Sequence, residues 1–163
     1  LKSNYNLPDL KLLIAGEFYE DEKNYDELLN DPAIKDGLIL HTHFISDSEV
    51  KYYLCAADCV IQPYRSATQS GVTPLAYHFE KPMIVTRVGG LPEIVPDNKV
   101  GFVTEVDPRA ITEAILRFYK EDKAAGFAAN LKAEKRKYSW TYFTDNIMSL
   151  YQQIREKGRD ELR

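Results

Sequence analysis

The segment at residues 66–72 carries the side chains best suited to binding chemistry in this chain. It reads SATQSGV, follows an apolar strand pattern and precedes an expected helix. Small hydroxyl and amide groups, free backbone N–H groups and the positive end of a helix dipole together favour an anion. Ser70 or Thr68 would equally serve as an ordinary helix cap. These residues therefore predict either a phosphate site or a capped helix.

A second candidate is the Gly89-Gly90 pair, which follows the next expected strand. Glycines suit a turn whose backbone approaches a ligand closely or takes a positive φ, and they equally suit a plain tight turn. Glu93 follows shortly after, where it would also fit the first turn of a short helix. Both interpretations are left open by the local pattern.

The elements that must position these residues alternate along the chain. Strands are expected at 10–15, 37–43, 59–63, 83–86 and 101–104, and helices at 24–29, after Ser46, and at 71–79, 109–120, 123–137 and 141–156. The apolar run at 10–15 suits a strand buried on both faces. Ser46 and Glu49 have the spacing of a capping box. The alternation predicts one α/β domain with a Rossmann-like, doubly wound parallel sheet.

Such a sheet binds ligands where the carboxyl ends of its strands lead into loops. Three loops qualify here, and they begin at Gly16, at Phe44-Ile45 and at Ser66. The Gly89-Gly90 turn would lie at the same edge. We therefore expect the candidate residues to meet at one edge of the sheet.

Composition excludes several classes of function. With 163 residues, a net charge of −4 and dispersed basic residues, the chain lacks the basic face of a nucleic-acid binder. No apolar run approaches the roughly 18 residues of a membrane span, and no signal-peptide pattern opens the chain. Cys55 and Cys59 lie in apolar surroundings, where we expect them in the core of a reduced, cytoplasmic protein. The start at Leu1, without an initiator Met, suggests a domain excised from a longer protein.

The order of these motifs resembles the C-terminal, donor-binding domain of GT-B glycosyltransferases, the retaining group 1 type related to sucrose and glycogen synthases. The matching segments are LLIAG at 12–16, FISDSEVKYYLCAADCVIQPY at 44–64, KPMIVTRVGGLPEIV at 81–95 and GFVTEVDPRAITEAI at 101–115. Each is weak alone, whereas their order and spacing are specific. The similarity covers residues 10 to about 154.

The resemblance implies that residues 1–156 form a nucleotide-sugar-binding domain that lacks its first strand, followed by a charged, frayed tail at 157–163. It implies transfer of a hexosyl-type group from a nucleotide-diphosphate sugar, as in polysaccharide biosynthesis. The acceptor would be held by an N-terminal domain of the same protein, and any peripheral membrane contact would pass through that domain. No cofactor, metal or nucleic acid is implied. The 163 residues alone are expected to be inactive.

The resemblance also implies a site. The loop at Phe44-Ile45 would cradle the nucleotide base, and residues 68–72 would hold the pyrophosphate. The expected substrate-binding residues are Gly16, Phe44, Ile45, Ser66, Thr68, Gln69, Ser70, Gly71, Val72, Gly89, Gly90 and Glu93. No catalytic residue can be assigned.

Two positions depart from the family pattern. Its members commonly carry glutamates on either side of the phosphate helix start, one near the sugar and one on the ribose, and alignment on Pro82 places these at Ala67 and Leu75. Either neutral side chains replace the carboxylates, or sugar recognition is weakened. The family's basic pair would precede Leu1, with Arg65 and Arg87 near the site in sequence.

Other functions stay open beside the leading one. A non-catalytic nucleotide-binding or regulatory domain derived from the GT-B fold would explain Ala67 and Leu75. A nucleotide-sugar epimerase would have the same architecture, but its catalytic carboxylates and histidines cannot be placed here. A response-regulator-like fold is disfavoured because no acidic pair follows the first expected strand.

Overall fold

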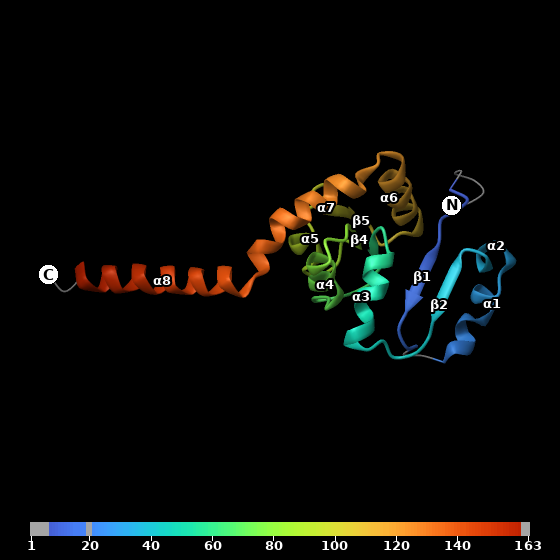
Figure 1. Ribbon diagram of the computed structural model, residues 1–163, viewed down its shortest axis with the longest axis horizontal. Coiled ribbons are helices and arrows are strands. Elements are labelled where there is room, and N and C mark those ends of the chain that lie inside the picture. The colour runs from blue at the N-terminus through green and yellow to red at the C-terminus, as the bar shows by residue number, and fades with distance from the viewer. Residues whose placement is uncertain (1–6, 19–20, 161–163) are drawn as a thin grey trace.

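The computed structural model describes residues 7–18 and 21–160 (Figure 1). Its elements are β1 (Leu12–Ala15), the 3-10 helix η1 (Glu22–Tyr25), α1 (Asp26–Leu29), α2 (Pro32–Lys35), β2 (Leu38–His41), α3 (Asp47–Ala56), β3 (Val60–Gln62), α4 (Val72–His78), β4 (Met83–Thr86), α5 (Leu91–Ile94), β5 (Gly101–Thr104), α6 (Pro108–Lys120), α7 (Lys123–Glu134), η2 (Lys135–Tyr138) and α8 (Trp140–Asp160).

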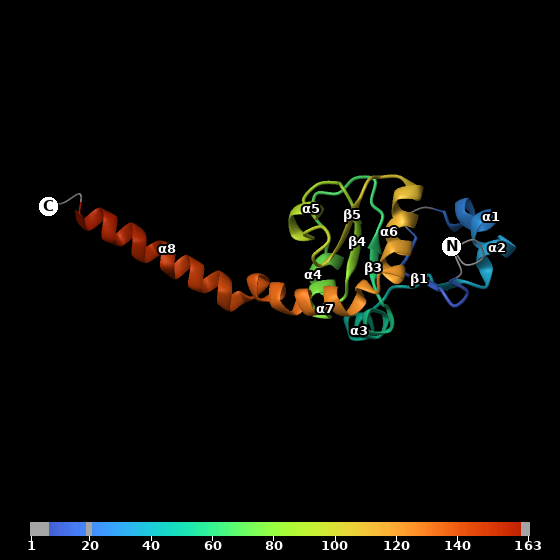
Figure 2. The ribbon, with the colours of Figure 1, turned by 90° about the horizontal axis from the view of Figure 1, so that it is seen from above.

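The main sheet has three parallel strands in the order β3-β4-β5. Its central strand β4 is buried along its whole length, because helices cover both faces. Met83 and Val85 pack with side chains of α4 and α5 on one face, whereas Ile84 packs with α6 and α7 on the other. Figure 2 shows this layered arrangement, with the sheet between α5 and α6. The predicted parallel, doubly wound character is confirmed here.

A second, two-stranded parallel sheet pairs β1 with β2, with Leu12 opposite Leu38. The five strands thus form two sheets rather than one among the described residues. The prediction of a first strand buried on both faces is wrong: Leu12 is 50% and Ile14 41% exposed. Within the described part of the chain β1 pairs along one edge only, so an apolar strand is left partly in solvent.

Two further expectations need correction. The helix expected to end near Asp31 is followed by a second short one, because Asp31 accepts from the backbone N–H of Ala33 at 2.8 Å and Pro32 opens α2. The short helix α5 follows Gly90 and has Glu93 in its first turn, as one of the two interpretations of Glu93 predicted. The last helix extends to Asp160, into the segment expected to be a frayed tail.

The two cysteines differ in environment. Cys55 is exposed, so its predicted place in the core is wrong. Cys59 packs beside the cluster around Phe118, and burial raises the pKa of its thiol to about 12. The α3 helix turns Cys55 outward because the helix buries the face that carries Leu54.

The predicted capping box at the start of α3 is present. Ser46 is the N-cap, and the Glu49 carboxylate accepts from its backbone N–H at 3.0 Å and from its hydroxyl at 2.5 Å. These bonds stabilise the ionised carboxylate, so they hold the pKa of Glu49 below its usual value. The cap fixes the point at which the chain leaves the β2 loop.

Replacing Ser46 with alanine is expected to lower the free energy of unfolding by about 1 kcal/mol at neutral pH. Because the folded-state pKa of Glu49 is depressed, its contribution is present above the unfolded-state pKa and is lost as the pH falls through the folded-state pKa. The difference in the free energy of unfolding between the wild type and Glu49→Gln should therefore shrink as the pH falls. Urea unfolding of both proteins across this pH range checks the sign, and a difference that grows towards acid would contradict it.

Candidate functional site

The loop between β3 and α4 is held against the end of the main sheet. The Thr86 hydroxyl donates to the Tyr64 carbonyl at 2.6 Å, which ties the start of the loop to β4. The Gly90 N–H donates to the Thr68 carbonyl at 3.0 Å, which ties its middle to the turn after β4. Two neighbouring strands thus position this loop at their carboxyl ends.

This loop lines an open cavity of about 450 Å³. The structure therefore brings together six of the predicted residues at one place: Ser66, Thr68, Gln69, Ser70, Gly71 and Val72. Tyr64 and Ala67 complete the lining, and neither was predicted as a site residue. The sequence could have indicated both residues, because Tyr64 lies just before the polar segment 66–72 and Ala67 lies within it.

The start of α4 combines a cap with free donors. Ser70 Oγ accepts from the Val72 N–H at 3.2 Å and lies 3.2 Å from the Tyr64 hydroxyl, so Ser70 satisfies one donor of the helix start from the position before the N-cap, which is Gly71. Pro74 has no N–H in the first turn. Within the described residues, the backbone N–H groups of Gly71 and Thr73 have no acceptor. Gly71 lines the cavity, whereas Thr73 is fully buried and does not, so the Gly71 N–H is the free donor that a phosphate oxygen could reach at this helix start.

The Gly89-Gly90 turn approaches the protein's own backbone closely. Gly89 has φ +50°, and a Cβ there would lie 1.8 Å from the Ala67 carbonyl oxygen. A Cβ at Gly90 would lie 3.2 Å from the Thr68 carbonyl oxygen. The positive φ of Gly89 and its close contact with the Ala67 carbonyl both demand glycine at position 89. The turn thus supports the cavity-lining loop from behind and does not line the cavity itself.

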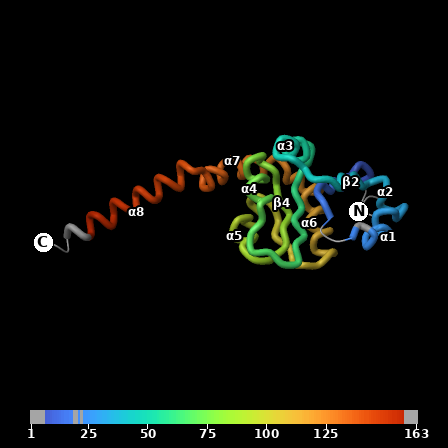
Figure 3. The backbone as a smooth tube through the Cα atoms, turned by 90° about the horizontal axis from the view of Figure 1, so that it is seen from below, coloured from blue at the N-terminus to red at the C-terminus, as the bar shows by residue number. Residues whose placement is uncertain are grey.

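The remaining predicted residues lie outside this cavity. Gly16, with φ +136°, donates its N–H to the His41 carbonyl at 3.0 Å at the end of the β1–β2 pair. Exposed Phe44 and half-buried Ile45 follow β2, and exposed Glu93 lies in α5. Figure 3 shows the β1–β2 pair on the side of the molecule opposite α4 and α5. The structure does not bring these residues into one pocket with residues 66–72.

Charge around the loop is sparse. Arg87 forms an ion pair with Glu105 at 2.9 Å, whereas Arg65 is exposed and has no ion-pair partner among the described residues. Ala67 presents its carbonyl to Gly89, and Leu75 is exposed on α4. The lining is therefore neutral, with hydroxyl, amide and backbone donors.

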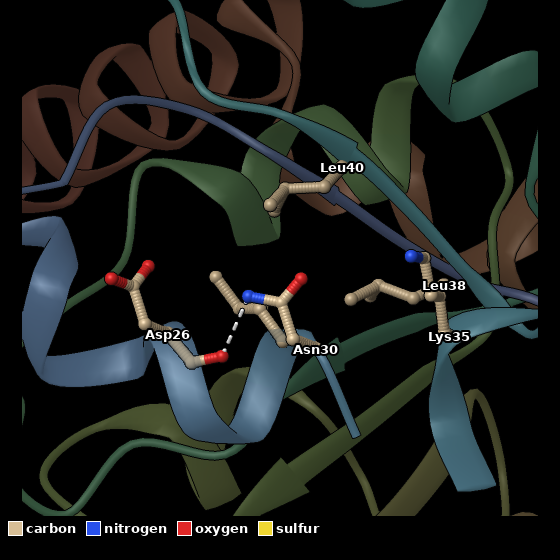
Figure 4. A pocket seen from close by; sticks show the side chains of 6 residues that line it. Asp26, Asn30, Lys35, Leu38 and Leu40 are labelled. Atoms are coloured by element: carbon tan, nitrogen blue, oxygen red, sulfur yellow. Dashed lines mark hydrogen bonds between the residues drawn. The ribbon is translucent and has the colours of Figure 1, made fainter. Parts of the chain in front are cut away.

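A second, smaller cavity of about 280 Å³ separates α1 from β2 (Figure 4). Its polar lining residues are Asp26, Asn30 and Lys35, and Asn30 Nδ2 donates to the Asp26 carbonyl at 2.9 Å. Leu38 and Leu40 of β2 line its apolar side. Sequence reasoning assigned nothing here. It is an incompletely filled space between a short helix and a strand.

Within residues 7–18 and 21–160, no group of three or more His, Cys, Asp or Glu side chains is arranged to hold a metal ion. No helix of the same part combines the length and the apolar character needed to cross a bilayer.

Sequence comparison finds glycosyltransferases. Residues 1–121 match the family described as group 1 glycosyl transferases. An uncharacterised glycosyltransferase of Methanocaldococcus jannaschii is 27% identical over 151 residues, which span 90% of this chain and 41% of that protein. The D-inositol 3-phosphate glycosyltransferase of Mycobacteroides abscessus is 28% identical over 153 residues, 89% of this chain and 33% of that protein. The chain thus spans less than half the length of these relatives.

Solved structures show the same fold. The sucrose-phosphate synthase of Thermosynechococcus elongatus aligns over 94% of this chain and 40% of its own, with a TM-score of 0.71 and 20% identity. HepE of Anabaena, crystallised in complex with UDP, aligns over 90% of this chain and 42% of its own, with a TM-score of 0.73 and 18% identity. The family match, which covers most of the chain, shows that this protein belongs to the group 1 glycosyl transferases.

Proposed function

We propose that this chain is the donor-binding part of an enzyme that transfers a glycosyl group from a nucleotide-diphosphate sugar. The observation that carries the proposal is the cavity lined by residues 66–72, in which the free N–H group of Gly71 lies beside neutral hydroxyl and amide side chains. The diphosphate occupies this cavity. The nucleotide base lies toward Phe44 and Ile45, at the end of β2.

In this reaction the protein orients the donor and stabilises the charge that develops on the departing diphosphate. Fixed backbone N–H donors perform this task without reorganising during the reaction. The loop is held by Thr86 and Gly90, so its donors are positioned before the donor arrives. Gly71 leaves room for close approach, because a Cβ there would meet no atom within 4 Å.

Residues of this loop do not account for recognition of the sugar. Ala67 and Leu75 have no side-chain acceptor for a sugar or ribose hydroxyl, so the loop suits a diphosphate better than it suits a particular sugar. The acceptor and further donor contacts come from an N-terminal domain of the same protein, and residues 1–156 form the donor domain. We place the enzyme in the cytoplasm, with any membrane contact made through that other domain.

A second candidate is a domain that binds a nucleotide without catalysis, and the same two residues favour it. The two functions differ in one result. Both bind a nucleoside diphosphate at residues 66–72, but only the transferase turns over a donor sugar in the full-length protein. Release of nucleoside diphosphate in the presence of acceptor therefore separates them.

Titration of the ¹⁵N-labelled protein with UDP, GDP and ADP tests the site. Amide shifts are expected at residues 44–46 and 66–72, with no change at Gly126 of α7, which serves as an internal control. Uridine, guanosine or adenosine without phosphates should leave Gly71 unshifted. Absence of any shift with all three diphosphates, in the full-length protein as well, would refute the proposed function.

A further inference from the structure

Gln62, the last residue of β3, is a polar side chain in apolar surroundings. It follows Val60 and Ile61 and is 2% exposed. Val60 packs against the cluster formed with α4 and α5, whereas Ile61 packs against the cluster formed with α6 and α7 on the opposite face of the sheet. Because side chains alternate along a strand, Gln62 lies on the face of Val60, which α4 covers.

The side-chain amide of Gln62 is only half paired. Its Oε1 accepts from the hydroxyl of Thr73, in the first turn of α4, at 3.1 Å. Its Nε2 is buried and has no hydrogen-bond partner among the described residues. Turning the amide over would leave its oxygen unpaired instead, because the hydroxyl is a single partner. A buried polar atom without a partner destabilises the folded state, so stability does not explain a glutamine at this position.

The first turn of α4 is weakly fixed by its own residues. The helix has seven residues, its N-cap Gly71 has no side chain with which to cap it, and Pro74 has no N–H. So short a helix depends on tertiary contacts for its stability. Thr73 is fully buried, and the bond from its hydroxyl to Gln62 joins this turn to the main sheet.

The backbone of Gln62 is held by the centre of the sheet. Gln62 lies opposite Val85 of β4, and the chain just after it is tied to β4 by the bond from the Thr86 hydroxyl to the Tyr64 carbonyl. Its side chain therefore extends from a rigid strand to the helix start that carries Gly71, a residue of the donor cavity. A group held in this way can fix the orientation of a neighbouring site.

We propose that Gln62 is a positioning residue for the diphosphate. Through its bond to Thr73 it fixes the rotation of the first turn of α4, and with it the direction of the Gly71 N–H. This inference rests on the proposed function, which places the diphosphate against that N–H. An apolar side chain at position 62 would fill the same space without a directional bond, so the turn could rotate. Local departures from the most stable choice of residue are expected at functional sites.

Replacing both partners with apolar groups of similar shape, Gln62→Met together with Thr73→Val, separates orientation from stability. The thermal unfolding midpoint of the full-length protein is expected to stay unchanged or to rise, because the half-paired amide and its partner are removed together. Calorimetric affinity for whichever of UDP, GDP and ADP the wild type binds is expected to fall at least about fivefold. A bond that only stabilised the fold would lower the midpoint as well.

Two further variants and one spectrum complete the test. Thr73→Ser, which restores the hydroxyl lost in Thr73→Val, is expected to restore the affinity. Thr104→Val is the matched control, because it removes another buried threonine hydroxyl, bonded to the Val85 carbonyl at 3.4 Å, outside the cavity lining. In the ligand-free protein, the Gly71 amide signal should broaden in the apolar double variant and stay sharp in the Thr104→Val control.

The outcomes separate this inference from the proposed function. Unchanged affinity in the double variant would overturn the positioning role and leave the donor site intact. A parallel fall of affinity and unfolding midpoint, or a Thr73→Ser variant as weak as Thr73→Val, would overturn it equally. A wild-type protein that binds none of the three diphosphates would refute the proposed function, and this inference with it.

Discussion

Replacing Gly71 with leucine is expected to raise the KM for the nucleotide-sugar donor at least about tenfold in the full-length enzyme, or to abolish turnover, with the fold intact. Gly71 lines the cavity, has φ −66° and has open space where a side chain would begin. The fold therefore accepts a leucine. That side chain would occupy the space through which the diphosphate reaches the N–H group of Gly71.

The measurement is steady-state kinetics with the donor varied, accompanied by thermal unfolding. Gly126→Leu provides a matched control, because Gly126 also has open space for a side chain and lies in α7, away from the cavity. That variant should keep the wild-type KM. Unchanged kinetics in a folded Gly71→Leu protein would refute the role of this helix start in binding phosphate.

Replacing Gly89 with alanine is expected to lower the free energy of unfolding by about 3 kcal/mol, the sum of a left-handed backbone penalty and an overpacked contact. The new Cβ would meet the Ala67 carbonyl oxygen at 1.8 Å, and Gly89 has φ +50°. The loop must therefore move away from the turn. Donor affinity should fall as well, because the same loop lines the cavity.

Gly90→Ala is the natural comparison. Its Cβ would lie 3.2 Å from the Thr68 carbonyl oxygen, and its φ of −82° suits any residue. Urea unfolding of the two variants should show a much smaller loss for Gly90→Ala. Equal losses would mean that the close contact with Ala67 is not the cause.

The order and type of most elements could be predicted because they depend on local patterns. The apolar run at 83–86 predicted a strand, and Ser46 with Glu49 predicted a helix start, both of which the structure confirms. The short helix α2 was missed. It is a single turn opened by Pro32, too short to show a helical period in the sequence.

The candidate site could be predicted in part. Residues 66–72 are contiguous, so one loop places them together once the flanking strand and helix are correct. The sequence could not decide between two roles for Gly89, a plain tight turn and a close approach to a ligand, because both require glycine. The tertiary structure places the Ala67 carbonyl where its side chain would be.

By itself, the sequence determined which residues form strands and helices, and which loop carries the small polar groups at the end of β3. Those properties follow from the period of apolar residues and from the chemistry of caps and turns. Only the tertiary structure decided which apolar faces are covered. Apolar β4 is buried on both faces, whereas large apolar side chains of β1 and α8 are exposed, because burial depends on neighbours that distant segments must supply.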